Sequence, residues 1–478
     1  MLCARGSLIK NFGKLAHGKG SVRFASTARQ VAPQQSSGAS NLTTQDNGLR
    51  VASYNNSKKT TTVGVWIDSG SRYETGTTNG VASLYEQLIY TGTPSRPASK
   101  LQSDLAKVGA QLKSVTTRDH TAYFAECMAG DVEQVVEILA EVLGNTEFTD
   151  AQLEEQRHIL LRKIEEHEET YRSWTYDNLH RTAFQGNSMS FAPIGVDKNV
   201  KNLTKEDVLE FADDHYKPHR MVLTGVGGVE HEQLERLAEK HFGHLKNEYK
   251  RKMPNPESLR HTARFTGSDF QFRNDLIPLM YVAIAVEGVP RGHPDALPLL
   301  VASQYCGNYD RKQSDTTIVP HTLQEKLSKM DECQAFESFS MNYANCGLFG
   351  MYYVCKGLHI WDVLCICKET QKFWKHLAFS AVDAEIDWAK YGLKTRLFKE
   401  LENNTNLASH VATEVLSNGK ITPLPDLEQQ IDAINAKTVQ KVMMQHVYDR
   451  DPALAGVGKT EAFPPWYDVK GGMSWWRM

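Results

Sequence analysis

The chain has 478 residues, of which 41% are apolar and 23% are charged, so it can build a large core and is not a disordered or fibrous protein. Its 54 Lys and Arg residues nearly balance 57 Asp and Glu residues without forming basic clusters, which excludes nucleic acid as the main partner. The longest uncharged apolar run, residues 276–286, is far shorter than the roughly 20 residues of a membrane-spanning helix, and the eight cysteines include no C-x-x-C pair that would indicate a zinc site.

The amino-terminal segment differs from the rest of the chain in its charge. Residues 1–45 contain no Asp or Glu, and their basic residues alternate with apolar residues and serines. This composition is typical of a mitochondrial transit peptide, with a disordered basic tail as the alternative. Because the sequence around Arg23 and Phe24 resembles a matrix cleavage site, we predict a mitochondrial transit peptide over residues 1–24 and a flexible N-terminus over residues 25–47.

Strand-like and helix-like segments alternate after residue 48, and their order occurs twice. The first half contains patterns typical of a strand, a helix, a strand and two helices, in that order, at residues 60–67, 79–90, 120–128, 132–143 and 150–169. The second half repeats a strand, a helix, a strand and a long helix at residues 279–286, 294–304, 347–355 and 382–402.

The clearest sign of an internal duplication lies near the end of each half. Residues 215–227 match residues 446–458 at a constant offset of 231 positions, and each stretch ends in a short strand followed by a glycine turn. We therefore predict two homologous halves, residues 48–248 and residues 264–478, instead of a many-repeat solenoid. The polar, proline-containing segment 249–263 is the predicted linker between them.

Four segments carry a resemblance to a known family: residues 63–74, 80–93, 225–231 and 242–245. They resemble the mitochondrial processing peptidase family of pitrilysin-like, inverted-motif zinc peptidases. Relatives in that family include the core subunits of ubiquinol–cytochrome c reductase, respiratory complex III. The resemblance covers nearly the whole chain after residue 48 and implies an α+β fold with two homologous halves, each a mixed β-sheet packed with helices around a cavity.

The resemblance also implies where a metal site would lie. Active members carry H-x-x-E-H on a helix, where two histidines on one face bind zinc and the glutamate activates water, and a distant glutamate is the third ligand. In this sequence the first histidine falls on Ser83, the base on Glu86, the second histidine on Gln87 and the distant glutamate on Lys163. Serine and glutamine oxygens are poor zinc donors, and a lysine about 4 Å from the ion would oppose binding by about 8 kcal/mol at an effective dielectric of roughly 20. The expectation is a remnant site with no catalytic residue, metal or cofactor.

Other histidines and cysteines have simpler explanations than metal binding. His231 begins a predicted helix, and His241 and His244 end it, where side chains of this type bond free backbone groups. His167 lies in a charged stretch and is expected on a solvated face, although with a shifted register it could replace the lost distal ligand. Cys365 and Cys367 would point in different directions on a helix, which argues against joint ligation.

The choice within the family depends on two further segments. Residues 304–321 contain one glycine, whereas the α-subunit of the processing peptidase has a glycine-rich loop there, and a β-subunit would keep its zinc ligands. Residues 463–478 resemble the aromatic tail of a complex III core subunit, and we expect this tail to dock on the chain itself or on a neighbour, so that its loss would weaken assembly more than folding.

The resemblance to core subunits implies a matrix-side scaffold without its own catalysis, peripheral to the mitochondrial inner membrane. Its partners would be a second core subunit, cytochrome b and other complex III subunits, with no nucleic acid and no transmembrane segment of its own. Whether a presequence peptide occupies the cavity stays open. The alternatives are a β-type processing peptidase with altered ligands and a matrix protein that binds presequences without cutting them.

Overall fold

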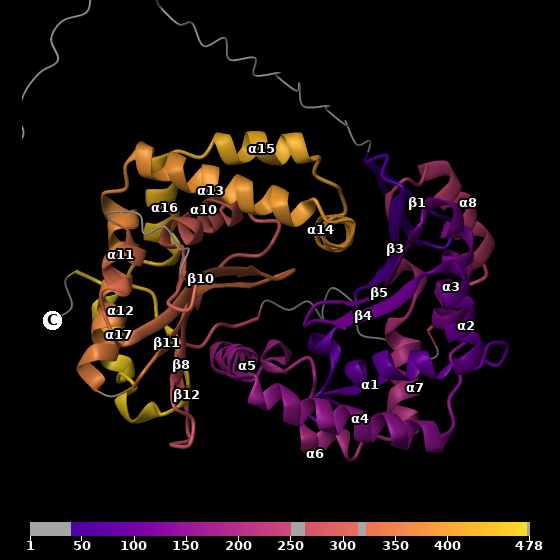
Figure 1. Cartoon of the computed structure of the whole chain (residues 1–478), viewed down its shortest axis with the longest axis horizontal. Coiled ribbons are helices and arrows are strands. Elements are labelled where there is room, and N and C mark those ends of the chain that lie inside the picture. The colour runs from indigo at the N-terminus through magenta and orange to yellow at the C-terminus, as the bar shows by residue number, and fades with distance from the viewer. Residues whose placement is uncertain (1–39, 250–262, 314–321, 358, 476–478) are drawn as a thin grey trace, which may run out of the picture. The chain divides into compact units, whose positions relative to one another are not determined.

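The structure is a computed structural model, which describes residues 40–249, 263–313, 322–357 and 359–475 (Figure 1). Two six-stranded mixed sheets organise these residues, one from each half of the sequence. Strands in the first sheet follow the order β1-β2-β6-β3-β5-β4, and those in the second follow β7-β12-β8-β11-β10-β9. The predicted α+β class, with a mixed sheet in each half, is therefore confirmed.

The first sheet is antiparallel except where β2 runs parallel to β6. Its strands are β1 (Ser40–Thr44), β2 (Arg50–Asn55), β3 (Thr60–Ile67), β4 (Gln111–Thr116), β5 (Thr121–Met128) and β6 (Met221–Gly227). Every residue of β3 after Thr60 is buried because both faces of the sheet are covered by helices. Burial on both faces explains why the sequence of β3 is a nearly continuous run of β-branched and apolar residues.

The helices of the first half have these bounds: α1 (Val81–Leu88), α2 (Ala98–Val108), α3 (Val132–Gly144), α4 (Asp150–Glu169), α5 (Tyr171–Ala183), α6 (Asp197–Val200), α7 (Lys205–His215) and α8 (His231–Phe242). Most of them pack on one face of the first sheet, where β3, α1, α3 and α8 share a single apolar core. The long helix α4 begins where predicted because Thr149 and Gln152 form a capping box.

The second sheet repeats this pattern, with β7 parallel to β12 and the other pairs antiparallel. Its strands are β7 (Asp269–Arg273), β8 (Met280–Glu287), β9 (Asn308–Asp310), β10 (Cys333–Asn342), β11 (Gly347–Cys355) and β12 (Ala453–Gly458). The two matching segments of the sequence end in β6 and β12, and each of these strands lies between a parallel and an antiparallel neighbour. The internal similarity thus corresponds to equivalent positions in two sheets.

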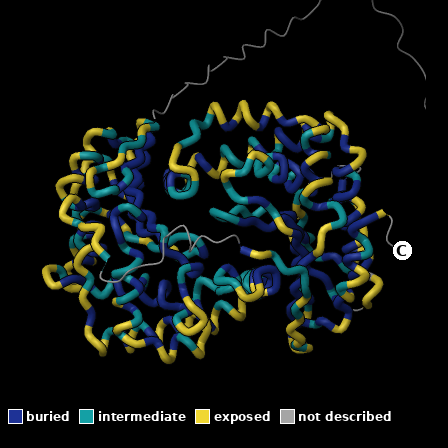
Figure 2. Tube along the Cα trace, turned by 180° about the vertical axis from the view of Figure 1, so that it is seen from behind, coloured by how far each residue is buried: buried dark blue, intermediate teal, exposed yellow. Residues whose placement is uncertain are grey.

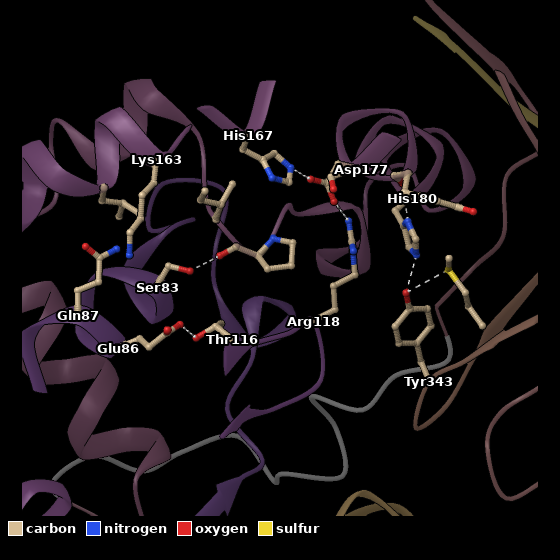
Figure 3. Close-up of a pocket in the computed structure, with 16 residues that line it drawn as sticks. Ser83, Glu86, Gln87, Thr116, Arg118, Lys163, His167, Asp177, His180 and Tyr343 are labelled. Carbon is tan, nitrogen blue, oxygen red and sulfur yellow. Dashed lines mark hydrogen bonds and ion pairs between the residues drawn. The ribbon is translucent and has the colours of Figure 1, made fainter. Parts of the chain in front are cut away.

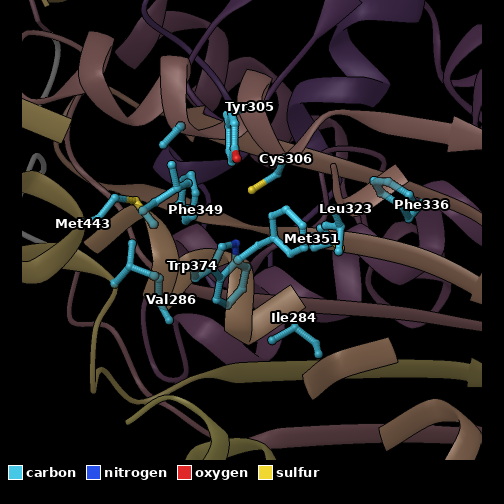
Figure 4. Packing of buried hydrophobic residues seen from close by; sticks show 14 of the residues in the cluster. Ile284, Val286, Tyr305, Cys306, Leu323, Phe336, Phe349, Met351, Trp374 and Met443 are labelled. Atoms are coloured by element: carbon cyan, nitrogen blue, oxygen red, sulfur yellow. The ribbon is translucent and has the colours of Figure 1, made fainter. Parts of the chain in front are cut away.

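The helices of the second half are α10 (Ala296–Cys306), α11 (Leu323–Ser328), α12 (Ile360–Phe379), α13 (Asp383–Leu401), α14 (Asn404–Asn418), α15 (Leu424–Asp432), α16 (Ala436–His446) and α17 (Trp466–Gly472). Side chains from the sheet and from α10, α12 and α16 form the largest apolar core, which includes Phe349, Trp374 and Met443 (Figure 4). Among the described residues, no helix combines the length and apolar character needed to cross a membrane.

The two halves exchange one helix each. Helix α5 packs on β8 and β12 of the second sheet, while α14 packs on β3 and β6 of the first. Alanines at 283, 285, 453 and 455 form the sheet surface under α5, and their small side chains let the helix approach closely. With this exchange the central strands of both sheets are almost entirely buried, and dark blue segments lie in the interior in Figure 2.

Two expectations about the chain ends need correction. Within the segment expected to be flexible, Ser40–Thr44 forms strand β1, because it pairs with β2 through a tight turn at residues 45–48. The aromatic tail docks on this chain, one of the two expected arrangements, over its described residues 463–475, and Val469 is completely buried in the core beside α12. This part of the tail therefore belongs to the fold, so the expectation that its loss would weaken assembly more than folding needs correction. Residues 1–39 and most of the predicted linker 249–263 lie outside the described residues, so the predicted boundaries stay predictions.

Candidate functional site

Helices α1 and α4 bring the four remnant positions together. Ser83, Glu86 and Gln87 on α1 and Lys163 on α4 line one cavity of about 480 Å³ (Figure 3). The i and i+4 spacing puts Ser83 and Gln87 on one face of α1, and α4 packs against that helix. The sequence correspondence therefore identified positions that meet in space, although Lys163 is 76 positions beyond Gln87.

The side chains at these positions are held in ways that do not suit a zinc ion. Ser83 Oγ donates a hydrogen bond to the carbonyl oxygen of Pro193 at 2.7 Å and so points away from a shared ion position. Glu86 accepts hydrogen bonds from Ser114 Oγ at 2.7 Å and from the hydroxyl of Thr116, both on β4. Gln87 and the cationic Lys163 supply no anionic or imidazole donor, so the residues present do not fit the metal of the family motif.

The opposite wall of the cavity is a buried ionic network. Asp177 lies 2.5 Å from Arg118 Nη2 and 2.7 Å from His167 Nε2. Burial alone would raise the pKa of Asp177, but the Arg118 charge and the His167 hydrogen bond hold it below its usual range. His167 lines the cavity and is only partly solvated, with 26% of its side chain exposed. Because Asp177 engages it, it does not act as a substitute ligand in this arrangement.

A fully buried histidine, His180, connects the two halves. His180 on α5 faces the carbonyl oxygen of Tyr176 through Nδ1 at 2.7 Å, and Tyr343 of the second half through Nε2 at 2.6 Å. Burial, reinforced by the Arg118 charge, lowers the pKa of His180 to about 3, so the ring is neutral near physiological pH. Since Nδ1 must then donate to a carbonyl oxygen, Nε2 accepts the hydrogen bond that the Tyr343 hydroxyl donates.

The other sequence candidates lie apart from this cavity. His231 is the first residue of α8, as predicted, but its Nδ1 lies 2.8 Å from the Ser53 hydroxyl on β2 and not on a free backbone group of the helix. Cys365 is exposed whereas Cys367 is buried against the hydroxyl of Tyr353, so the two thiols diverge on α12 as expected. Among the described residues, no group of three or more His, Cys, Asp or Glu side chains is placed to hold a metal ion.

Sequence analysis also missed Glu74, a buried residue that supports the site from the start of α1. Glu74 accepts hydrogen bonds from the backbone N–H groups of Gly80 at 3.0 Å and Ala82 at 2.8 Å and from Asn79 Nδ2 at 2.7 Å, so it anchors the start of α1. Gly80 precedes the helix with a φ of 104°, a conformation that favours glycine. An acidic residue shortly before a glycine and a helix is a weak signal, which no spacing rule would single out.

Burial raises the pKa of Glu74 to about 7 despite these three hydrogen bonds. When the pKa of a carboxyl group is higher in the folded chain than in the unfolded chain, the folded chain becomes less stable as pH rises from the unfolded-state pKa to the folded-state pKa. We expect the free energy of unfolding to fall by about 2–3 kcal/mol between pH 4.5 and pH 7.5 from this group. Because an amide does not titrate, Glu74→Gln should remove that part of the pH dependence.

Urea unfolding of the isolated subunit at both pH values tests this expectation, with Glu239→Gln on the exposed face of α8 as the control. The free energy of unfolding of the Glu239 variant should change with pH as it does in the wild type. That of the Glu74 variant should change less. Equal slopes for all three proteins would show that Glu74 does not titrate in this range.

Comparison with known proteins gives matches over nearly the whole chain. Residues 50–194 match the family model described as insulinase (peptidase family M16), and residues 202–393 match the peptidase M16 inactive domain. The cytochrome b-c1 complex subunit 1 of Caenorhabditis elegans is 40% identical over 463 residues, which cover 96% of each chain. The mitochondrial-processing peptidase subunit beta of Bos taurus is 35% identical over 434 residues, covering 91% of this chain and 87% of the relative.

A solved structure shares the fold. A chain in the structure of Complex III2 from Candida albicans with Inz-5 bound superimposes with a TM-score of 0.81 at 24% sequence identity. The match covers 91% of this chain and 99% of that chain. Together with the two family models, it confirms the fold that the sequence resemblance implied.

Proposed function

The chain belongs to the insulinase family, peptidase family M16, and we propose that it is the first core subunit (core protein 1) of mitochondrial ubiquinol–cytochrome c reductase, complex III. In this role it is a structural component that supports assembly and stability. The observation that carries the proposal is the 40% identity to a cytochrome b-c1 complex subunit 1 across 96% of both chains. A match of this length extends beyond the segments that the two family models match.

The chemistry of the cavity supports a role without catalysis. Ser83, Gln87 and Lys163 replace the ligands that the family motif requires, and Glu86 is engaged by two hydroxyl groups of β4. A cation at position 163 repels a divalent ion, and hydroxyl and amide oxygens do not compensate for two lost imidazoles. The match of residues 202–393 to the peptidase M16 inactive domain also supports a role without catalysis.

Membrane association then depends on partner subunits. The described residues contain no helix suited to crossing a membrane, so the chain would be peripheral to the inner membrane, on its matrix side. A second core subunit and cytochrome b are the proposed neighbours, together with other subunits of the complex. Residues 1–24 would direct import and be removed afterwards, consistent with their lack of acidic residues.

Native gel electrophoresis of detergent-solubilised mitochondria tests the assignment. We expect this chain to migrate with cytochrome b, because an obligate interface of more than about 2,000 Å² should survive mild detergent. A matrix protein treated in the same way is the control for nonspecific association. Migration only as a free chain, or as a dimer of processing-peptidase size, would exclude the proposed subunit role.

A β-type processing peptidase is the second candidate, because the bovine enzyme subunit is 35% identical over most of both chains. A presequence-binding matrix protein would use the same cavity without cutting. Metal content and cleavage of a presequence peptide separate the peptidase from the other two hypotheses. Comigration with cytochrome b separates a core subunit from a free binding protein.

A further inference from the structure

A second cavity lies where α14 crosses from the second half to the first sheet. Its volume is about 420 Å³, and it is bounded by the β8–α10 loop, the end of β10 and the helices α10, α14 and α15, which lie together in Figure 1. This volume falls within the roughly 300–1,000 Å³ that is typical of small-molecule sites. The cavity shares no lining residue with the cavity of the remnant positions, so a ligand here would be separate from the peptidase-like site.

Two cations in the wall of this second cavity have no partner. Arg291 lies in the β8–α10 loop, and Lys420 lies in the α14–α15 loop. Within the part of the chain that the structure describes, neither side chain forms a hydrogen bond or an ion pair. The one carboxylate among the lining residues is Glu414, whose Oε2 accepts the backbone N–H of Thr422 at 2.9 Å. The fixed charges of the wall therefore leave an excess of one positive charge.

Two neutral donors lie in the same wall. His410 on α14 has a buried Nε2 atom without a hydrogen-bond partner. Burial, reinforced by the Arg291 charge, lowers the pKa of His410, so the ring is neutral at pH 7.5 and can carry its proton on Nε2. Asn342 accepts the Ser340 hydroxyl at 3.0 Å through Oδ1, so its amide nitrogen can also donate to a ligand. A ligand that accepts these bonds would remove the cost of an unsatisfied buried nitrogen.

The remaining wall is largely apolar. Leu297 and Leu300 of α10 and Leu427 of α15 line it, and the first two are only partly buried by the chain itself. A ligand that covers these side chains would gain from removing apolar surface from water. The cavity thus combines donors and unpaired cations for an anionic group with an apolar wall for a hydrocarbon chain.

We propose that this cavity binds a small monocarboxylate with an apolar chain, such as a medium-chain fatty acid, with its carboxylate at Arg291 and His410. The guanidinium group matches the two oxygens of a carboxylate. One negative charge balances the excess positive charge of the wall, whereas a phosphate monoester, with nearly two, would exceed it. Binding at this site does not depend on a role in complex III.

Isothermal titration of the full chain with octanoate, in detergent-free buffer at pH 7.5, tests the chemical class. We expect one saturable site per chain. Octanoate should bind at least about 10-fold more tightly than butyrate, because each fully buried methylene contributes up to about fourfold. Octanol and octylammonium, which lack the negative charge, should bind at least about 10-fold more weakly than octanoate, and so should hexyl phosphate.

Arg291→Gln tests the position of the carboxylate. Loss of a hydrogen bond between charged groups should weaken octanoate binding at least about 10-fold. Arg236→Gln on the exposed face of α8 is the matched control and should bind octanoate as the wild type does. Because Arg291 is partly exposed and unpaired, its variant should unfold within about 2 °C of the wild-type midpoint.

A photoreactive octanoate with a diazirine on its chain locates the site directly. Mass spectrometry should find the label on residues 291–300 or 410–430, and excess octanoate should prevent the labelling. Labelling around Lys163, or equal binding by the wild type and Arg291→Gln, would overturn the proposed site. Absence of saturable octanoate binding, or tighter binding of hexyl phosphate or octylammonium, would overturn the proposed ligand class. None of these results bears on comigration with cytochrome b, so the two proposals fail separately.

Discussion

Removal of residues 466–478 is expected to unfold the second half of the chain and not only to weaken its assembly. Val469 is completely buried and Met473 is 2% exposed, and both belong to the core that includes Trp374. Their loss would open a cavity worth about 2–4 kcal/mol for each side chain. The total is therefore comparable to the whole stability of a typical domain, about 5–15 kcal/mol.

Polar contacts also make the stability of the second half depend on α17, which lies within the removed residues. Gln371 Nε2 donates to the carbonyl oxygen of Val469 at 2.6 Å, and Lys375 Nζ donates to that of Gly472 at 2.9 Å. Lys470 is buried and pairs with Asp451 at 2.7 Å. Truncation would leave the polar groups of Gln371 and Lys375 without these partners.

A pair of point variants separates folding from assembly. Val469→Asp places a charge in the core and should lower the midpoint of thermal unfolding by at least about 10 °C, or prevent soluble expression. Tyr467→Asp changes a neighbouring residue that is 82% exposed, and it should leave the midpoint within about 2 °C. Differential scanning calorimetry of the isolated subunit measures both. An unchanged midpoint for Val469→Asp would contradict the docked position of α17.

Local patterns predicted much of the fold because local physics determines those elements. The helix expected at residues 150–169 has those bounds in the structure, since its capping box and apolar spacing lie within the segment itself. The strand at residues 347–355 is likewise found as predicted. The duplicated stretches at 215–227 and 446–458 correctly indicated two equivalent strands, because the same position in a sheet needs the same buried residues and glycine turn.

The exchange of α5 and α14 could not be predicted, because it depends on contacts between residues far apart in sequence. Leu179 of α5 packs on the second sheet, and Val411 of α14 packs on the first. The apolar pattern of each helix would fit the sheet of its own half equally well. The network of Arg118, Asp177 and His167 likewise joins β4–β5 loop and helix residues that no motif connects. In the cavity, the family resemblance located the remnant positions, but the hydrogen bonds that hold Ser83 and Glu86 required the structure.

The triple variant Ser83→His, Gln87→His and Lys163→Glu should bind one zinc ion per chain, whereas the wild-type subunit should bind none. Two imidazoles on one face of α1 and a carboxylate on α4 would supply three protein ligands. The cavity of about 480 Å³ beside Ser83 gives the new imidazole room without moving the helix. Elemental analysis after dialysis measures zinc content. The unfolding midpoint with added zinc is a second measurement, and it should rise. At a free zinc concentration 100 times the dissociation constant, bound zinc should stabilise the folded chain by about 2.7 kcal/mol.

The double variant Ser83→His and Gln87→His, which keeps Lys163, is the matched control. If the cation is the main barrier, the double variant should bind zinc at least about 100-fold more weakly than the triple variant, because part of the roughly 8 kcal/mol repulsion at 4 Å persists after the lysine moves aside. Equal binding by both would show that Lys163 does not oppose the metal. No zinc in the triple variant would show that α1 and α4 are not spaced for shared ligation. Peptide cleavage need not return in any variant, because Glu86 stays engaged by Ser114 and Thr116 and is not free to activate water.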